Sequence, residues 1–114
     1  MGYYSQAALC AKKKDFEELK KRLEKYDYLF STGYSEITEF DNGEVVVWNI
    51  DGIKWYPSFK EIDIIEDFII ELQSEDKDYS FVRVGEDYND IEYKSNYVTG
   101  ECDRVHPYQG IDIG

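Results

Sequence analysis

The sequence predicts an α+β fold, with an antiparallel sheet of four to six strands and two helices on one face of it. Three observations favour this class. The 114 residues suit one domain, and 42% of them are hydrophobic, which is too rich for a disordered chain. Two segments repeat apolar residues at helical spacing, and other short segments are rich in β-branched and aromatic residues. We expect a single domain over residues 1–98 and an irregular C-terminal tail over residues 99–114, which holds three of the eight glycines.

The first two elements are predicted to be a strand and a helix. Residues 3–11 contain an apolar run and are predicted to form the strand. Asp15 can cap the helix that follows, and Glu18 can reach back to the amide of that cap. The next apolar residues are spaced by three or four and so share one helical face: Phe16, Leu19, Leu23 and Tyr26. Residues 29–33 are expected to form a loop.

The middle of the chain is predicted to form strands joined by tight turns. Strands are expected over residues 34–40 and 44–50, because the turn sequence Asp41-Asn42-Gly43 lies between them. Asp51-Gly52 allows two interpretations. It is either a second hairpin turn that leads into a strand over residues 53–56, or a bulge within one long strand.

A second helix is predicted from about Phe59 to about Gln73, with Ser58 and Glu61 as a capping box. Its buried face is expected to hold Ile62, Ile65, Phe68, Ile69 and Leu72. Carboxylates recur every four residues on the opposite side, at Asp63, Asp67 and Glu71. Like charges at this spacing cost a few tenths of a kcal/mol per pair, and the helix has no lysines placed to remove that cost. The pattern therefore indicates an acidic face that is retained for use.

The remaining elements complete the predicted sheet. Residues 79–84 alternate well and are predicted to form a strand, residues 85–90 an acidic loop, and residues 91–98 a short edge strand. The resulting order is β-α-β-β-(β)-α-β-β. This order resembles the ferredoxin-like arrangement, with extra strands.

The charge is strongly acidic and unevenly distributed. There are 25 acidic and 13 basic residues, a net charge of -12. Residues 31–114 hold 20 of the acidic and six of the basic residues, a local net charge of -14. Such a surface repels nucleic-acid phosphates and attracts basic proteins, so direct nucleic-acid binding is not expected. The longest apolar run, residues 45–48, is far too short for a membrane span, so no membrane association is expected.

The sequence carries little that points to catalysis or to a cofactor. Cys102 and His106 could form a thiol–imidazole pair, but nothing in the sequence positions them. Cys10 lies in a predicted central strand and is interpreted as a small buried hydrophobe. The carboxylates of residues 87–92 lack the glycine and the distant glutamate of a calcium loop. We therefore expect no enzyme, no metal and no cofactor.

Three segments stand out along the chain: Gly2-Tyr3-Tyr4-Ser5, Ile53-Lys54-Trp55-Tyr56-Pro57-Ser58-Phe59, and Phe81-Val82-Arg83-Val84-Gly85-Glu86-Asp87-Tyr88-Asn89-Asp90-Ile91-Glu92. They resemble landmarks of a family of small proteins encoded by tailed bacteriophages and prophages. Members usually carry a basic residue where Tyr4 stands. The resemblance implies a phage origin and action in the cytoplasm of the bacterial host, and it implies no established activity.

These observations lead to one hypothesis and two alternatives. The hypothesis is an anti-defence, anti-CRISPR-like inhibitor, whose acidic surface mimics nucleic acid and binds a basic host protein. Its predicted contact residues are Asp63, Asp67, Glu71, Glu86, Asp87, Tyr88, Asp90 and Tyr93. The first alternative is a small-molecule binder that sequesters a nucleotide immune signal, with Lys54, Trp55, Tyr56, Arg83 and Arg104 as candidate ligand-binding residues. The second, lower alternative is a hydrolase that uses paired carboxylates.

Overall fold

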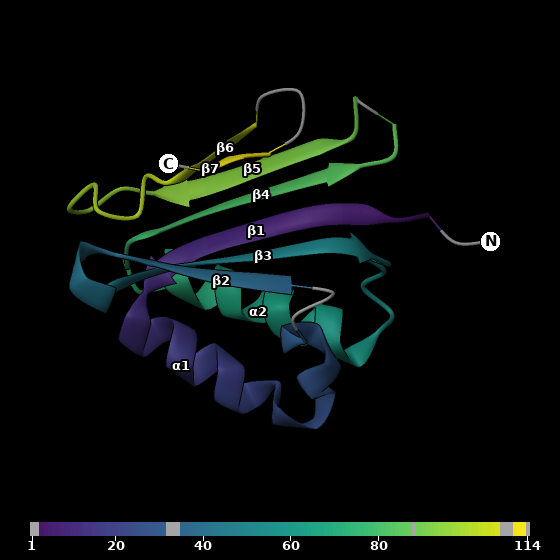
Figure 1. Ribbon diagram of the computed structural model, residues 1–114, viewed down its shortest axis with the longest axis horizontal. Coiled ribbons are helices and arrows are strands. Elements are labelled where there is room, and N and C mark those ends of the chain that lie inside the picture. Colours follow the sequence, from purple (N-terminus) through teal and green to yellow (C-terminus); the bar gives the residue numbers. More distant parts are fainter. Residues whose placement is uncertain (1–2, 32–34, 88, 108–110, 114) are drawn as a thin grey trace.

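A computed structural model describes residues 3–31, 35–87, 89–107 and 111–113 (Figure 1). Helices follow β1 and β3, and the chain ends in four successive strands. The elements are β1 (Ser5–Lys12), α1 (Lys13–Arg22), the 3₁₀ helix η1 (Glu24–Phe30), β2 (Ser35–Phe40), the 3₁₀ turn η2 (Asp41–Gly43), β3 (Val45–Ile53), α2 (Lys60–Ser74), β4 (Tyr79–Gly85), β5 (Ile91–Asn96), β6 (Val105–Pro107) and β7 (Ile111–Ile113). None of the described helices is long and apolar enough to cross a membrane.

Five of the described strands form one antiparallel sheet in the order β2-β3-β1-β4-β5, which confirms the predicted class. β1 lies in the centre, where Leu9 faces Trp48 of β3 on one side and Phe81 of β4 on the other. A central strand is covered on both faces and is therefore apolar at successive positions. The uninterrupted run of small and apolar residues in β1 fits this place.

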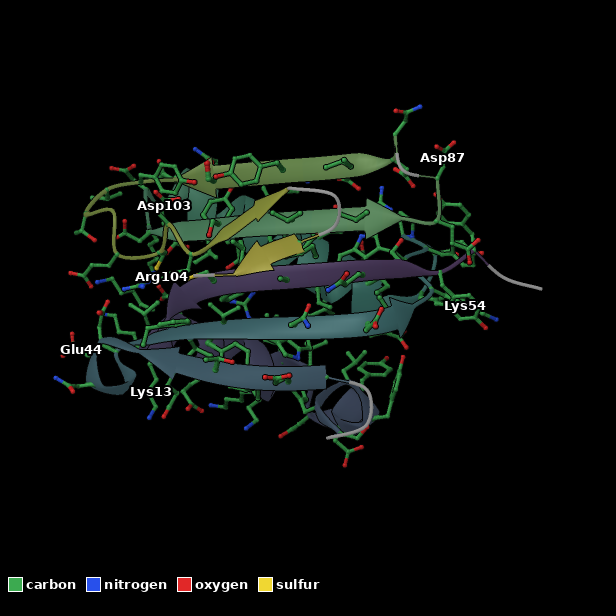
Figure 2. The ribbon with its side chains drawn as sticks, turned by 45° about the horizontal axis from the view of Figure 1, so that its top comes forward. Lys13, Glu44, Lys54, Asp87, Asp103 and Arg104 are labelled. Carbon is green, nitrogen blue, oxygen red and sulfur yellow. The ribbon has the colours of Figure 1, made fainter. Side chains whose placement is uncertain are left out.

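The two faces of the sheet are covered by different elements. Alternate residues of β1, Ala7 and Leu9, belong to the main core beneath α1 and α2. Their neighbours Ala8 and Cys10 belong to a smaller cluster on the opposite face, with Cys102 and Val105. Figure 2 shows the β6–β7 hairpin in front of the sheet and the helices behind it. The period of two along a strand thus divides the core into two layers.

The inward face of α2 matches the prediction. All five residues named for it are buried in the main core: Ile62, Ile65, Phe68, Ile69 and Leu72. Burying a side chain of this size contributes about 1.5–3 kcal/mol relative to leaving it exposed. Packing of this face, rather than capping, therefore holds α2 on the sheet.

Both predicted capping boxes are wrong. α1 begins at Lys13, and its N-cap residue, Lys12, makes no side-chain cap. Asp15 lies inside the first turn, is buried, and accepts a hydrogen bond from Lys77 Nζ over 3.2 Å. The N-cap residue of α2 is Phe59 instead of Ser58. In α1, the carboxylate of Asp15, which the local pattern assigned to the cap, is instead bound by the distant Lys77.

The segment after α1 is also more regular than expected. Tyr26 has non-helical dihedral angles, and a second, 3₁₀ helix, η1, occupies part of the predicted loop. Leu29 is fully buried, and the ring of Phe30 stacks on Trp48 with 4.7 Å between the ring centroids. These two apolar side chains draw the chain back onto the core, and this explains the ordered turn.

The two hairpin questions in the middle of the chain are resolved by backbone geometry. Asp41, Asn42 and Gly43 have positive φ, as the predicted turn between β2 and β3 requires. Asp51 and Gly52 lie inside β3, and the register between β1 and β3 shifts opposite them. Of the two interpretations, the bulge within one long strand is correct.

The C-terminal segment differs from the irregular tail that the sequence predicted. It contains the short antiparallel strands β6 and β7, and Cys102 and Val105 are fully buried. Asp78 anchors its start, because its carboxylate accepts hydrogen bonds from the amides of Val98 and Thr99, each over 2.8 Å. The second face of the sheet carries apolar residues, and burying them under Cys102 and Val105 stabilises the ordered conformation of this segment.

Candidate functional site

The carboxylates on the outer side of α2 do not all have the same surroundings. Asp63 and Asp67 are exposed, and their side chains bond to no other described residue. Glu71 instead accepts two hydrogen bonds from the guanidinium of Arg22, over 2.6 and 3.0 Å. This ion pair lowers the pKa of Glu71. The prediction of an unpaired stripe is therefore wrong for Glu71, since its cation comes from α1 rather than from α2.

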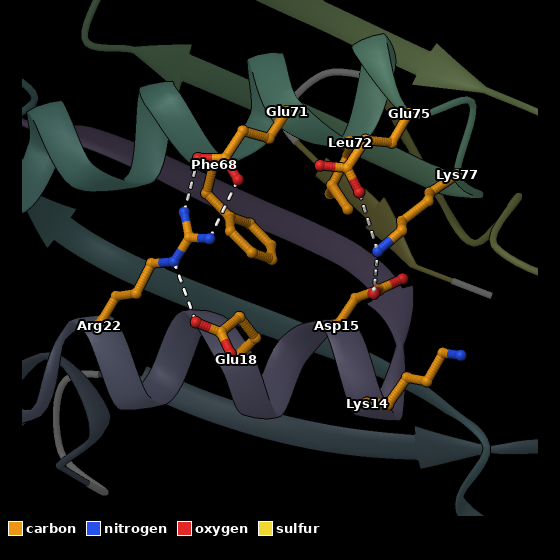
Figure 3. A pocket seen from close by; sticks show the side chains of 9 residues that line it. All are labelled: Lys14, Asp15, Glu18, Arg22, Phe68, Glu71, Leu72, Glu75 and Lys77. Atoms are coloured by element: carbon orange, nitrogen blue, oxygen red, sulfur yellow. Dashed lines mark hydrogen bonds and ion pairs between the residues drawn. The ribbon is translucent and has the colours of Figure 1, made fainter.

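Glu71 lies in a groove of about 260 Å³ between α1 and α2 (Figure 3). Arg22 also binds Glu18 over 3.1 Å. Farther along the groove, Lys77 binds both Asp15 and Glu75, over 3.2 and 3.3 Å. Its lining is Lys14, Asp15, Glu18, Arg22, Phe68, Glu71, Leu72, Glu75 and Lys77. These ion pairs join α1 to α2 and to the turn after α2, and a cation is bound to each of the four carboxylates Asp15, Glu18, Glu71 and Glu75.

A second charged cluster lies where β4 turns into β5. The guanidinium of Arg83 is almost buried and bonds to Asp90 over 2.8 and 3.2 Å, to Glu92 over 2.6 Å and to the hydroxyl of Ser5 over 3.0 Å. The hydroxyl of Tyr3 donates to Asp90 over 2.9 Å. We call these five residues the Arg83 cluster. Two of the three sequence segments that stood out meet in it.

The Arg83 cluster separates the predicted contact residues of the acidic loop. Asp90 belongs to the cluster, where Arg83 and Tyr3 bind its carboxylate, although its side chain is still 36% exposed. Glu86 is exposed and accepts a hydrogen bond from the amide of Tyr4 over 3.1 Å. Asp87 is exposed, and its carboxylate accepts from the amide of Asn89 over 3.1 Å. Glu86 and Asp87 therefore remain accessible at the turn.

The two aromatic residues predicted as anchors have different outcomes. Tyr88 lies outside the described residues. Tyr93 is 40% exposed on the edge strand β5, and its hydroxyl contacts that of Tyr97.

Acid should weaken the Arg83 cluster. Hydrogen bonds from Arg83, and then from Tyr3, lower the pKa of Asp90. A carboxyl with a lowered pKa in the folded state stabilises the protein above its unfolded pKa of about 4, and this stabilisation is lost as the pH falls through the folded pKa. We expect the urea midpoint to fall below about pH 4, and to fall less steeply in Asp90→Asn. Asp67→Asn, an exposed control, should retain the wild-type slope; equal slopes for all three proteins would contradict this prediction.

The residues of the small-molecule alternative are not brought together. Figure 2 shows Lys54 at one end of the sheet and Arg104 at the other. Arg104 binds Asp41 over 3.3 Å, and Lys54 lies over the ring of Tyr4 at 5.6 Å. Arg83 is engaged in its cluster. These cations do not converge on one cavity.

The two aromatic residues of that alternative are occupied elsewhere. Trp55 donates its indole N–H to Glu66 over 2.9 Å, and Tyr56 accepts from the amide of Tyr3 over 2.8 Å. Both bonds join segments within the protein. No described lysine or arginine lies over the ring of Trp55 or Tyr56, so these rings do not combine with a cation into a stacking site for a nucleotide.

The described residues form neither an activated nucleophile nor a cluster of metal ligands. Cys10 and Cys102 are both buried, and a hydrogen bond to Cys102 together with burial raises the pKa of the Cys10 thiol. A buried thiol with a raised pKa is a poor nucleophile. The side chain of His106 lies outside the described part of the chain. Within that part, no three His, Cys, Asp or Glu residues are grouped to hold a metal ion.

Comparison of the chain with protein-family models, with curated proteins and with solved structures finds no significant match. The candidate site therefore rests on its own geometry. The Arg83 cluster was missed by sequence reasoning, because Arg83 was assigned to the small-molecule alternative and Asp90 to the acidic contact residues, while Tyr3, Ser5 and Glu92 were assigned no role. The one available signal was that Tyr3, Arg83 and Asp90 lie in two of the three segments that stood out.

Proposed function

We propose that this protein acts by stoichiometric binding, with an acidic surface that lies against a basic groove of a partner protein. The proposed contact residues are the exposed carboxylates Asp63 and Asp67 of α2, together with Glu86 and Asp87 of the β4–β5 turn. One observation carries the proposal: Asp63 and Asp67 stand one turn apart on the outer face of α2, exposed and without a cation among the described residues. All four carboxylates lie in residues 31–114, which carry a net charge of -14.

Binding would follow from charge and hydrogen bonding. Arginine presents a planar fork of donors that matches a carboxylate, and a hydrogen bond to a charged group contributes about 1.5–3 kcal/mol. The net negative field speeds the approach of a basic partner. Carboxylates held one helical turn apart on a rigid helix would occupy positions where a basic groove otherwise receives phosphates.

The biological setting of the proposal comes from the family resemblance. It would place the protein in the cytoplasm of a phage-infected bacterium, as an anti-defence inhibitor of a nucleic-acid-binding effector. We also propose the finer fold assignment, a ferredoxin-like arrangement extended by β5. The neighbour order β2-β3-β1-β4 and the position of α1 and α2 along the chain support it.

The acidic surface has more support than either alternative. A nucleotide-binding site needs convergent cations, whereas Arg83 is engaged with Asp90 and Glu92 and lies apart from Arg104. A carboxylate hydrolase needs one desolvated and one ionised carboxyl that face each other across a cleft. The carboxylates of the interhelical groove are instead bound to Arg22 and Lys77.

Charge reversal on α2 tests the proposal. We expect Asp63→Lys with Asp67→Lys to lose capture of basic proteins, from a bacterial lysate cleared of nucleic acid and of added nuclease, by at least about tenfold, since two charge-assisted contacts become repulsive. Glu71 is left unchanged, because replacing it would break the pair with Arg22. Captured proteins are quantified by mass spectrometry. Double-stranded DNA, added as a competitor, should release them from the wild-type protein.

The control changes the charge by the same amount elsewhere. Glu17→Lys in α1 with Glu24→Lys in η1 reverses the charge of two exposed carboxylates away from α2 and should preserve capture. Circular dichroism should show that both double variants fold. Equal capture by the two variants, or capture that DNA does not displace, would remove the acidic surface of α2 from the proposal.

A further inference from the structure

β5 is an open edge of the sheet. It is paired with β4 on one side, and in the described part of the chain no strand is paired with its other side. Figure 2 shows β5 at the margin of the sheet, with the β6–β7 hairpin lying over the sheet instead of beyond this edge. Such an edge presents a row of main-chain donors and acceptors, and these can pair with another strand.

Exposed apolar side chains gather along this edge. Nine large hydrophobic side chains are exposed in the described part of the chain, and five of them lie here: Ile70, Ile91, Tyr93, Tyr97 and Val98. Ile70 of α2 is the most exposed of all, at 59%. A groove of about 630 Å³ runs between α2 and β5, lined in part by Ile69, Ile70 and Tyr79. Grouped apolar exposure beside a polar edge marks an interaction surface.

The strand sequence favours one occupant, a second copy of β5. In an antiparallel pair, two residues that lie opposite each other point their main-chain N–H and C=O groups either both toward the partner strand or both away from it, and the two kinds alternate along a strand. When a strand pairs with its own copy, residues that lie opposite each other are therefore separated by an even number of positions. The twofold axis must then pass between one residue and its own copy. An axis at Tyr93 opposes Glu92 to the second copy's Lys94, and does so twice. An axis at Glu92 or at Lys94 instead opposes like charges. Among axes at Ile91, Glu92, Tyr93 and Lys94, only the one at Tyr93 opposes unlike charges without also opposing like charges.

The other edge of the sheet lacks this property. β2 carries Glu36 and Glu39 and no basic residue. Its self-pairing about Ile37 opposes Glu36 to Thr38, so no ion pair can form. Opposite charges directly across two strands stabilise their pairing, and β5 can make two such pairs.

We infer that two copies of this chain pair through β5, antiparallel, about a twofold axis at Tyr93, to form one continuous ten-stranded sheet. Reciprocal Glu92–Lys94 pairs fix the register, and Tyr93 meets its own copy at the axis. The side chain of Lys94 already lies 3.8 Å from Glu92 of its own strand, so four alternating charges would cluster at the centre. The net charge of -12 opposes association, but this repulsion decays over about 8 Å at physiological ionic strength. The inference is independent of the proposed acidic surface.

Sedimentation equilibrium at physiological salt tests the inference. We expect the wild-type protein to approach twice its 13.5 kDa mass as its concentration rises. Lys94→Glu should weaken dimerisation by about thirtyfold or more, because two attractive pairs become repulsive. Lys21→Glu makes the same change in net charge on exposed α1 and should dimerise like the wild type, as should Ile37→Glu on β2.

A charge swap tests the register itself. Glu92→Lys alone should be monomeric, and mixing it with Lys94→Glu should give a heterodimer, because the two chains then carry opposite charges along β5. If Glu92→Lys fails to fold, since Glu92 also binds Arg83, Tyr93→Lys places two like charges at the axis and should abolish dimerisation. A wild-type protein that stays at 13.5 kDa, or dimers equally strong in Lys94→Glu and Lys21→Glu, would overturn the inference.

Discussion

Replacing Trp48 by alanine is expected to lower the free energy of unfolding by about 3–5 kcal/mol, as truncation of a buried aromatic ring does. Trp48 is 2% exposed and lies 4.7 Å from the ring of Phe30 and 5.9 Å from that of Phe16. The cavity would lie where β3, α1 and η1 meet. Urea unfolding followed by circular dichroism measures the change without depending on the lost fluorophore.

Trp48→Phe is the matched control for this prediction. The indole N–H of Trp48 is buried without a hydrogen-bond partner among the described residues. An unsatisfied buried donor costs about 1–3 kcal/mol, so phenylalanine removes that cost while it loses some packing. The two effects oppose each other, and Trp48→Phe should lie within about 1.5 kcal/mol of the wild type. If it is as unstable as Trp48→Ala, the indole N–H has a partner.

Gly85→Ala is expected to destabilise the protein by about 1–3 kcal/mol, the usual cost of an added methyl group in a tightly packed place. A Cβ atom at Gly85 would lie 2.3 Å from both the carboxylate of Asp90 and the hydroxyl of Tyr3. Both groups belong to the Arg83 cluster. They would have to move, and their movement would break the Tyr3–Asp90 bond and weaken the hold of Asp90 on Arg83.

Two comparisons separate this cause from simple loss of a glycine. Gly52 has a φ of +71° and open space around it, so Gly52→Ala measures backbone strain without a clash. Tyr3→Phe removes the hydroxyl that Gly85→Ala displaces, so the double variant should cost less than the two single variants together. Additivity within about 0.5 kcal/mol would show that Gly85 and Tyr3 do not share one cluster.

The sequence predicted features that depend on neighbouring residues better than features that depend on distant ones. The inward face of α2 and the turn at residues 41–43 follow from local spacing and from residue types that accept positive φ, so they could be found without the fold. The roles of Asp15 and Ser58 could not. A capping box is a local pattern, and for Asp15 a stronger distant partner, Lys77, overrode it.

The candidate site divides in the same way. The sequence identified the acidic residues of α2 and of the β4–β5 turn, but it treated them as one set. In the structure Glu71 and Asp90 bind arginines, whereas Asp63, Asp67, Glu86 and Asp87 are exposed and form no ion pair with a described residue. The edge strand was predicted as well. The sequence alone provided no reason to connect Glu92 and Lys94 with self-pairing, because only the structure shows that β5 is an edge strand.

By itself, the sequence determined the α+β class, the acidity and the apolar faces, because each depends on composition or on neighbours within a few residues. Tertiary structure alone decided which charges are neutralised. Arg22 and Glu71 are 49 positions apart, and Tyr3 and Asp90 are 87 apart. Charge interactions act through space and weaken steeply once water separates the groups, so only the folded chain selects which carboxylates are left for a partner.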